Sequence, residues 1–279
     1  MTYSVLLSVY RKDSPVFLAE ALDSIYKDQT KKPDEIVIVE DGPVSDETDD
    51  VLKRFSEKIY NNGDSRIKIV DLGQNRGLGA ALKEGTKHCT GDYIFRMDAD
   101  DISVPQRFEV MSEYLESHPD IDVLGSDIGE FIDDPERVIR RRVCPSDKNG
   151  IIKMSRKRNP MNHVSVAIKR SSLIKVGGYV TMPLIEDYYL WVRMLANGMK
   201  LANLNKTLVK VRVGSDFEIR RSRTDRIRSW KKLQNYMLLH GMIGRPRAFW
   251  NMLCIRLFVY SPSTIKRFVY GKLLRKKNK

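Results

Sequence analysis

The stretch "GDYIFRMDADD", residues 91–101, places three carboxylates directly behind a short apolar run. An apolar run of this kind is typical of a strand buried in a parallel sheet. Asp98, Asp100 and Asp101 follow it within four positions. Like charges this close repel one another unless a positive group lies among them. The stretch therefore predicts a buried strand whose carboxyl end holds a positively charged partner.

The residues before this stretch alternate between strand and helix patterns. Apolar runs over residues 4–10, 35–41 and 66–72 are each followed by apolar side chains at helical spacing. Ser14 and Ser45 are suitable N-cap residues for the first two of these helices. Strand–helix repeats this short predict an α/β fold with parallel strands, right-handed crossovers and helices on both faces of the sheet.

Three of the predicted strands end in polar clusters, at residues 10–13, 40–41 and 98–101. In open α/β sheets, ligands bind in the crevice outside the carboxyl ends of the strands. We therefore expect the three clusters to meet in one crevice, which would be the functional site.

The pattern is less regular after this point. We expect a helix from Pro105 to Ser117, an irregular basic stretch over residues 133–160, and helical, basic sequence from Lys206 onward. The other expected elements are strands over residues 122–132 and 162–172 and a helix over residues 186–198.

The 279-residue chain carries a net charge of +13, and this charge is unevenly spread. Residues 205–279 contain 20 Lys and Arg side chains and three acidic ones, whereas the rest of the chain is slightly acidic. Such asymmetry indicates that the tail meets an anionic surface. The three cysteines show no CxxC spacing, and no signal-like or membrane-spanning run is present, so we expect a cytosolic protein.

The acidic cluster has two interpretations. In one, Asp101 or Ser103 caps the helix behind Pro105 and the other acids are solvated. In the other, Asp98 and Asp100 turn toward one hard cation, Mg²⁺ or Mn²⁺, together with the oxygens of a diphosphate. An EF-hand is excluded because Ile102 and Ser103 stand where the calcium loop needs Asx and Gly. We favour the cation, which would neutralise a departing nucleotide diphosphate.

The ordered set "SVLLSVYRKD", "EIVIVEDG", "NRGLGAALKEG", "GDYIFRMDADD" and "EDYYLW" resembles the inverting family-2 glycosyltransferases with the GT-A fold, a Rossmann-like mixed, mostly parallel sheet with flanking helices. The bacterial enzymes of surface-polysaccharide biosynthesis are the most similar group. The resemblance covers about residues 3–215.

This resemblance implies roles for particular residues. Asp98 and Asp100 would form the DxD motif, with Asp100 the more direct metal ligand. The nucleotide would be held by a further set: Ser8, Tyr10, Asp41 and Arg76, of which Asp41 would accept the imide N–H of uracil or thymine. Two departures are that "EDGP" replaces the usual "DDGS" and that no QxxRW motif follows, which favours transfer of a single sugar over processive synthesis.

The acceptor hydroxyl must lose a proton when it attacks the donor, and a carboxylate is a suitable general base. The resemblance assigns this role to Asp187, with Glu186 beside it, and in-line attack would invert the anomeric centre. The alternative is that both acids simply complement the dipole of a helix N-terminus. We expect His163 to be structural or to hydrogen-bond the acceptor, and Trp191 to lie in the core.

The basic tail, residues 245–279, reads as two amphipathic helices rich in aromatic residues, Lys and Arg, the second beginning near Ser263. This composition favours the surface of an anionic membrane over a nucleic acid. The alternative is a helical subdomain packed on the catalytic core or on a dimer partner. We expect a catalytic domain over residues 1–215 and a membrane-surface segment over residues 216–279.

Together these features predict a metal-dependent inverting hexosyltransferase at the inner face of the cytoplasmic membrane. It would move one sugar from a UDP-hexose such as UDP-galactose, UDP-glucose or a UDP-N-acetylhexosamine to a polyprenyl-diphosphate-linked glycan. The alternatives are a dTDP-rhamnose-using enzyme of the same fold and a non-catalytic membrane-surface scaffold.

Overall fold

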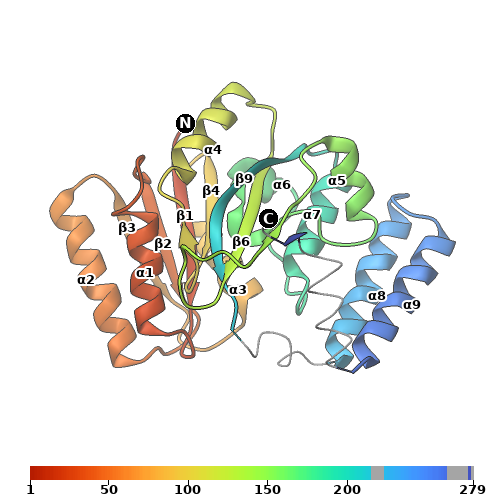
Figure 1. The fold of residues 1–279 in the computed structure, drawn as a ribbon, viewed down its shortest axis with the longest axis horizontal. Helices are drawn as coiled ribbons and strands as arrows, with labels where there is room; N and C mark the ends of the chain where they lie inside the picture. Colours follow the sequence, from red (N-terminus) through yellow and green to blue (C-terminus); the bar gives the residue numbers. More distant parts are fainter. Residues whose placement is uncertain (215–222, 263–275, 278–279) are drawn as a thin grey trace.

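The computed structural model describes residues 1–214, 223–262 and 276–277. A single mixed sheet forms the centre of the molecule (Figure 1). Its parallel half has the strand order β3-β2-β1-β4, and its antiparallel half continues as β8-β6-β7-β10, with β9 beside β6 and β5 beside β9. The strands are β1 Tyr3–Val9, β2 Glu35–Glu40, β3 Arg66–Asp71, β4 Tyr93–Asp98, β5 Ile102–Ser103, β6 Val123–Phe131, β7 Arg140–Arg142, β8 Ala167–Lys169, β9 Leu201–Arg212 and β10 Lys276–Lys277.

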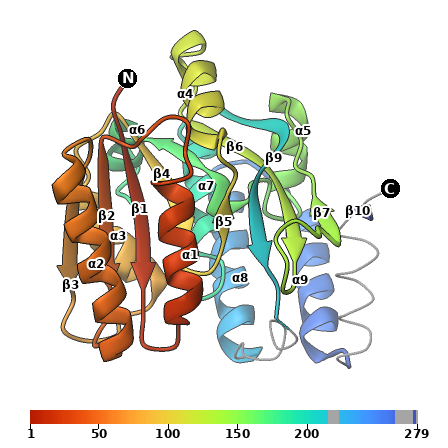
Figure 2. The ribbon, with the colours of Figure 1, turned by 60° about the vertical axis from the view of Figure 1, so that its left-hand side comes forward.

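Helices cover both faces of this sheet, as the parallel repeats predict. One apolar cluster joins the sheet to α1, α2 and α4, and a second joins its other face to α3, α5, α6 and α7 (Figures 1 and 2). The helices are α1 Pro15–Ile25, α2 Asp46–Asn62, α3 Leu78–His88, α4 Arg107–Ser117, α5 Lys148–Ser155, α6 Arg170–Lys175, α7 Glu186–Ala196, α8 Arg223–Leu239 and α9 Arg245–Tyr260, with a 3-10 turn at His163–Ser165.

The start signals read from the sequence are confirmed. The Ser45 hydroxyl accepts a hydrogen bond from the Thr48 amide at 3.3 Å, and the Ser14 hydroxyl accepts a longer one from Phe17 at 3.5 Å. Both serines are in extended conformation just before their helices, as N-caps require. These caps fix where each helix begins behind its strand.

The second half of the chain differs from the prediction in three places. Residues 201–212 form the long strand β9, where helical sequence was expected from Lys206. The alternating pattern of "TLVKVRV" is that of a strand, and its basic charge misled the interpretation. The stretch 133–160, expected to be irregular, contains β7 and α5. The strand expected over residues 162–172 is only β8, between a 3-10 turn and α6.

The helices α8 and α9 form a hairpin at the end of the molecule opposite α2 (Figure 1). A third apolar cluster, which includes Tyr188, Leu233 and Met237, joins this hairpin to α7. The hairpin is therefore packed on the α/β domain, and one face of α9 is left exposed. The second tail helix expected near Ser263 lies outside the described residues. Among the described helices, none is long and apolar enough to cross a membrane.

Candidate active site

The carboxyl ends of the parallel strands meet at one edge of the sheet, as expected. Ser8 near the end of β1 is in register with Asp98 at the end of β4, and Val9 is in register with Glu40 at the end of β2. The Asp41 amide donates to the Val9 carbonyl at 2.8 Å. The three polar clusters therefore lie together at this edge of the sheet, and the space outside the edge is called the crevice below.

Asp41 is buried and anchors the loop that leads into α3. Its carboxylate accepts hydrogen bonds from the backbone amides of Arg76 at 2.6 Å and Gly77 at 2.8 Å. Gly42 has a φ of +84°, and a Cβ there would lie 2.5 Å from the Asn75 amide nitrogen. Only glycine fits this close approach of two backbones. The "EDG" and "NRG" motifs thus form one unit, in which Asp41 shapes the loop that carries Arg76.

A positive partner for the acidic cluster is present in the chain itself. Arg96, in the middle of the buried strand β4, forms an ion pair with Asp98 and is only 2% exposed. Desolvation is the largest single influence and acts to lower the pKa of Arg96, but the charge and hydrogen bond of Asp98, together with Tyr179 and Asp101, raise the pKa overall. The Nε and Nη1 atoms of Arg96 have no hydrogen-bond partner among the described residues. The guanidinium thus relieves part of the repulsion that the sequence indicated.

Negative charge nonetheless remains in the crevice. Asp100 reaches solvent, but protein atoms crowd the crevice around it, and this desolvation with the charge of Asp98 raises the pKa of Asp100 to about 6. Desolvation, with the charges of Asp100 and Asp98, also raises the pKa of Asp13 to about 7. The Asp13 carboxylate accepts from the Tyr10 amide at 2.9 Å, which holds the turn after β1 in place. Asp13 therefore lies within electrostatic reach of the DxD pair.

Asp101 has a different role from its neighbours. It is buried, and its carboxylate accepts a hydrogen bond from the Arg212 amide at 2.9 Å. The Arg212 side chain donates to the Asp100 carbonyl at 3.2 Å and is stacked between Phe17 and Phe131, 3.9 and 4.6 Å from their ring centres. The N-cap of α4 is Gln106, so the interpretation of Asp101 as a helix cap is wrong. Asp101 instead fastens the end of β9 to the acidic turn.

These residues fit a divalent cation that shares its coordination with a diphosphate. Asp98 and Asp100 offer hard oxygen donors, and their uncompensated charge favours a cation. Among the described residues, no group of three or more His, Cys, Asp or Glu side chains could hold a metal by themselves. A cation here would therefore take further oxygens from a ligand, as Mg²⁺ commonly does beside phosphates.

Glu186 and Asp187, the two acids expected on the acceptor side, lie in the first turn of α7. The Asp187 carboxylate accepts a hydrogen bond from the Asn159 amide at 2.5 Å. Burial raises the pKa of Asp187, although Tyr188, Arg142, Asn159 and Arg96 act in the opposite direction. A Cβ at Gly79, in the first turn of α3, would lie 3.6 Å from the Cβ of Glu186. The loop shaped by Asp41 and the start of α7 are therefore neighbours.

His163 is part of the frame around this site. Its Nε2 lies 2.9 Å from the Tyr179 hydroxyl, and its ring packs edge-to-face on Trp191, which is fully buried in the core as expected. Burial, with the charge of Arg96, lowers the pKa of His163 well below its usual range. A neutral, half-buried histidine that contacts Tyr179 and Trp191 supports the structural interpretation.

The structure thus joins the predicted residues through side chains that the sequence did not reveal. The charge of Arg96 pairs with Asp98 and acts on Asp187 and His163, so the acidic turn after β4 and the start of α7 share one buried cation. A basic residue inside an otherwise apolar strand was the available signal. Asn159 lay in a stretch read as irregular, and nothing in its local pattern indicated its bond to Asp187.

A mixed sheet flanked by helices, with acidic side chains at the carboxyl ends of its parallel strands, is the architecture expected of a GT-A glycosyltransferase. Residues 4–179 match the family model described as "Glycosyl transferase family 2". The chain is 38% identical to an uncharacterized glycosyltransferase of Haemophilus influenzae over 99% of this chain and 100% of that one. The chain therefore belongs to glycosyl transferase family 2.

Two further relatives have more specific names. The chain is 38% identical to the Escherichia coli UDP-Gal:alpha-D-GlcNAc-diphosphoundecaprenol beta-1,3-galactosyltransferase, over 98% of this chain and 97% of that one. It is 36% identical to the amylovoran biosynthesis glycosyltransferase AmsE of Erwinia amylovora, over 97% of this chain and 98% of that one.

Solved structures show the same fold at low sequence identity. The S. aureus TarS fragment 1–349 in complex with UDP-GlcNAc matches with a TM-score of 0.69 and 17% identity, covering 98% of this chain and 76% of that one. The match to a longer TarS chain covers 45% of it. The mannosyltransferase PcManGT of Pyrobaculum calidifontis, in complex with GDP-Man and Mn²⁺, matches with a TM-score of 0.61 and 19% identity, covering 92% and 69%.

Proposed function

We propose that this glycosyltransferase is a metal-dependent, inverting hexosyltransferase that uses a UDP-sugar and extends a lipid-linked glycan by one sugar. The observation that carries the proposal is the pairing of Asp98 with buried Arg96 beside an Asp100 whose pKa is raised to about 6. This arrangement leaves excess negative charge at the edge of the sheet where donors bind in such folds. The name of the E. coli relative supports both the donor class and the lipid diphosphate acceptor.

On the donor side, the base and ribose would lie against Ser8, Tyr10 and the loop held by Asp41. Because both Asp41 carboxylate oxygens already accept backbone amides, a hydrogen bond to the imide N–H would be an additional one to the same carboxylate. Asp98 and Asp100 would hold the cation, which when bound neutralises the charge on the nucleotide diphosphate as it leaves. Arg76, fixed by the same loop, would contact the phosphates or the base.

On the acceptor side, Asp187 would remove the proton from the attacking hydroxyl. Its raised pKa makes it a better base than an ordinary aspartate, and Asn159 holds its carboxylate in one orientation. Attack from the side opposite the leaving diphosphate inverts the anomeric centre. An α-linked donor would therefore give a β-linked product.

The donor half of the proposal is tested by calorimetric titration of UDP with and without Mn²⁺. Wild type should bind UDP at least tenfold more tightly with Mn²⁺, and Asp100→Ala should lose this enhancement because it removes a metal ligand. Glu57→Ala, which removes an exposed acid from the second half of α2, is the matched control and should behave as wild type. Tight UDP binding that is indifferent to Mn²⁺ in all three proteins would refute the metal site.

The hairpin α8–α9 would hold the enzyme at an anionic membrane surface. Several large apolar side chains of α9 are solvent-exposed. Arg245 and Arg247 precede them in the helix, and Arg256 lies among them. The exposed apolar residues are Phe249, Trp250, Leu253, Leu257 and Tyr260. A basic helix with this exposed face suits the interface of a leaflet rather than a water-facing surface.

A further inference from the structure

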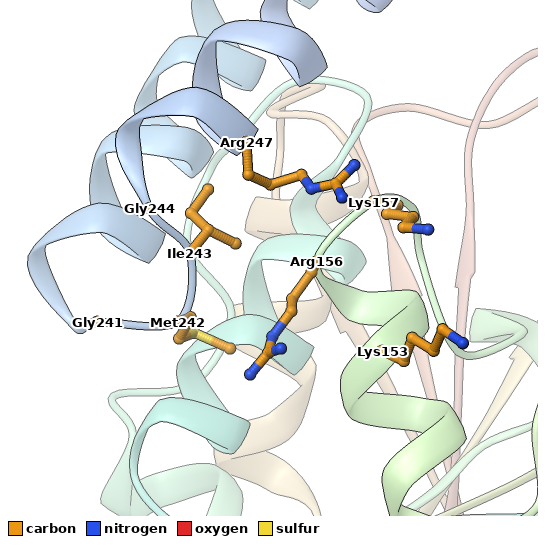
Figure 3. A pocket seen from close by; sticks show the side chains of 8 residues that line it. All are labelled: Lys153, Arg156, Lys157, Gly241, Met242, Ile243, Gly244 and Arg247. Atoms are coloured by element: carbon orange, nitrogen blue, oxygen red, sulfur yellow. The ribbon is translucent and has the colours of Figure 1, made fainter.

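A basic cavity lies between the end of α5 and the turn that joins α8 to α9 (Figure 3). It has a volume of about 510 Å³, within the usual range for ligand pockets. Met242, Ile243 and the backbone of Gly241 and Gly244 form its apolar wall. Four cations complete the lining: Lys153, Arg156, Lys157 and Arg247. They come from two elements, with Arg247 extending from α9 toward Lys157 in Figure 3.

None of these four cations forms an ion pair with an acid among the residues that the structure describes. Four like charges gathered around one cavity repel one another unless an anion lies among them. Arginine and lysine in such a cluster match the oxygens of a phosphate or diphosphate, arginine through two parallel hydrogen bonds. The cavity is therefore suited to a multiply charged anion.

The walls of this cavity are fixed by hydrogen bonds to the neighbouring helices. Asn251, which is buried in α9, donates to the Arg156 carbonyl at 2.9 Å and to the Gln234 side chain of α8 at 2.8 Å. The Tyr188 hydroxyl of α7 donates to the Ser155 carbonyl at 2.6 Å. These hydrogen bonds hold the cavity in shape at the interface between the hairpin and the rest of the molecule.

The same segment leads directly to the proposed general base. Lys157 is two residues from Asn159, whose side chain holds the Asp187 carboxylate. Two residues span at most roughly 7 Å. In an acceptor that is a single sugar linked through diphosphate to a lipid, as in the name of the E. coli relative, the diphosphate is attached to the sugar being extended. Its binding site must therefore lie close to the base, as this cavity does.

We propose that the cavity lined by Lys153, Arg156, Lys157 and Arg247 is the binding site for the diphosphate of the lipid-linked acceptor. This inference rests on the proposed function. The lipid chain would leave the cavity along the exposed apolar face of α9, which begins two residues after Arg247 at Phe249. The acceptor's charge thus meets the basic cavity and its hydrocarbon meets the apolar helix face.

The test measures binding of farnesyl diphosphate, a prenyl diphosphate, to the full-length chain by calorimetry. Arg156→Gln/Arg247→Gln should weaken this binding at least tenfold and leave binding of UDP with Mn²⁺ unchanged. Lys231→Gln/Lys232→Gln removes two exposed charges from α8 outside the cavity, and should leave both affinities unchanged. Farnesol, which lacks the diphosphate, should bind wild type and the cavity variant equally weakly.

Two results would overturn the proposal. One is that wild type binds UDP with Mn²⁺ but does not bind farnesyl diphosphate. The other is that the cavity variant loses binding to phosphatidylglycerol vesicles while its affinity for farnesyl diphosphate is unchanged, which would make the cavity a contact for membrane headgroups. Absence of UDP binding in wild type would instead contradict the proposed function, so the two failures are distinguishable.

Discussion

Arg96 links the two halves of the active site at the scale of single residues. It is almost completely buried and pairs with Asp98, and its charge opposes the rise that desolvation causes in the pKa of Asp100 and Asp187. A second buried arginine, Arg107, donates to the Arg96 carbonyl at 2.7 Å, and burial together with the charge of Arg96 lowers the pKa of Arg107 to about 9. The positive charges of Arg96 and Arg107 oppose each other, and the negative charges of Asp98 and Asp101 offset part of this repulsion.

Replacement of Arg96 by methionine should therefore destabilise the fold. Methionine fills a similar volume without charge, which leaves Asp98 without its partner; breaking such a pair costs about 3 kcal/mol when it is buried. Because Asp98 is partly exposed and solvent screens its charge, we expect a smaller loss in the free energy of unfolding than for a fully buried pair, about 2 kcal/mol. Urea unfolding measures the change, with the exposed Arg54→Met as control. Equal stability of the two variants would show that the ion pair contributes little.

Asp187→Asn should separate catalysis from stability. Loss of the general base should lower kcat by about 10²–10⁴-fold, with donor binding unchanged. In wild type, kcat should rise with pH along an acid limb whose midpoint lies above the usual aspartate pKa, because the base must be deprotonated. Steady-state kinetics between pH 4 and 8 measure both effects. An unchanged kcat in the variant would exclude Asp187 as the base.

The same substitution has a predictable effect on stability. The pKa of Asp187 is raised in the folded state, so the folded protein binds the proton more tightly than the unfolded chain does. The stability contributed by this group therefore falls as pH rises from the unfolded pKa through the folded one. Asp187→Asn should raise the Tm at pH 8 relative to wild type and change it less at pH 4, as measured by thermal scans. An equal shift at both pH values would contradict the burial argument.

At the scale of elements, α3 is pressed closely against β1 and β2 because one of its positions is glycine. A Cβ at Gly85 would lie 2.5 Å from Leu6 and 2.6 Å from Val39, whereas a Cβ at Gly79 in the same helix would make ordinary contacts of 3.6 Å or more. The depth at which α3 packs sets the position of the Arg76 loop before it. The close packing of α3 on the sheet therefore requires glycine at position 85 but not at position 79.

Alanine at these two positions should have opposite effects. Gly85→Ala must push α3 away from the sheet and should destabilise the fold by about 1–3 kcal/mol. Gly79→Ala meets no clash and should stabilise the helix by about 0.5–1 kcal/mol. Denaturant unfolding of both variants measures the difference. A neutral Gly85→Ala would show that the helix can shift without cost.

The elements were predictable where local signals agreed with the sheet. The strand–helix repeats of residues 1–117 have clear apolar periods and caps, and the structure confirms them. The strand β9 was missed because its alternation is carried partly by Lys210 and Arg212, whose charge reads as a basic helix. The partnerships of Arg96 with Asp98 and of Asn159 with Asp187 join residues through three-dimensional packing, which no local pattern encodes.

At the scale of the whole molecule, the active site lies between the sheet edge and α7, and the α8–α9 hairpin packs against the other side of α7. The hairpin adds the basic cavity and the exposed face of α9 to one end of the molecule (Figure 1). This arrangement would let a lipid-linked acceptor approach from a membrane surface while the nucleotide-sugar enters from water.

The membrane contact can be tested on α9. Phe249→Ser/Trp250→Ser should reduce co-sedimentation with phosphatidylglycerol vesicles about tenfold or more, because two large side chains no longer enter the interface. Tyr60→Ser, which removes an aromatic residue that is 85% exposed on α2, is the control and should sediment as wild type. Vesicle binding that is unaffected by both changes would place the contact elsewhere.

We propose that sugar transfer from a nucleotide donor takes place in the crevice and needs both Asp100 and a divalent cation. Nucleotide release should be measured with Mn²⁺ and a short-chain GlcNAc-diphosphate-lipid, across UDP-, dTDP- and GDP-sugars. We predict release from one UDP-hexose that is abolished by EDTA and reduced at least a hundredfold in Asp100→Ala, with Glu57→Ala unchanged. Release that persists at the wild-type rate in Asp100→Ala, or that proceeds equally well in EDTA, would contradict the account.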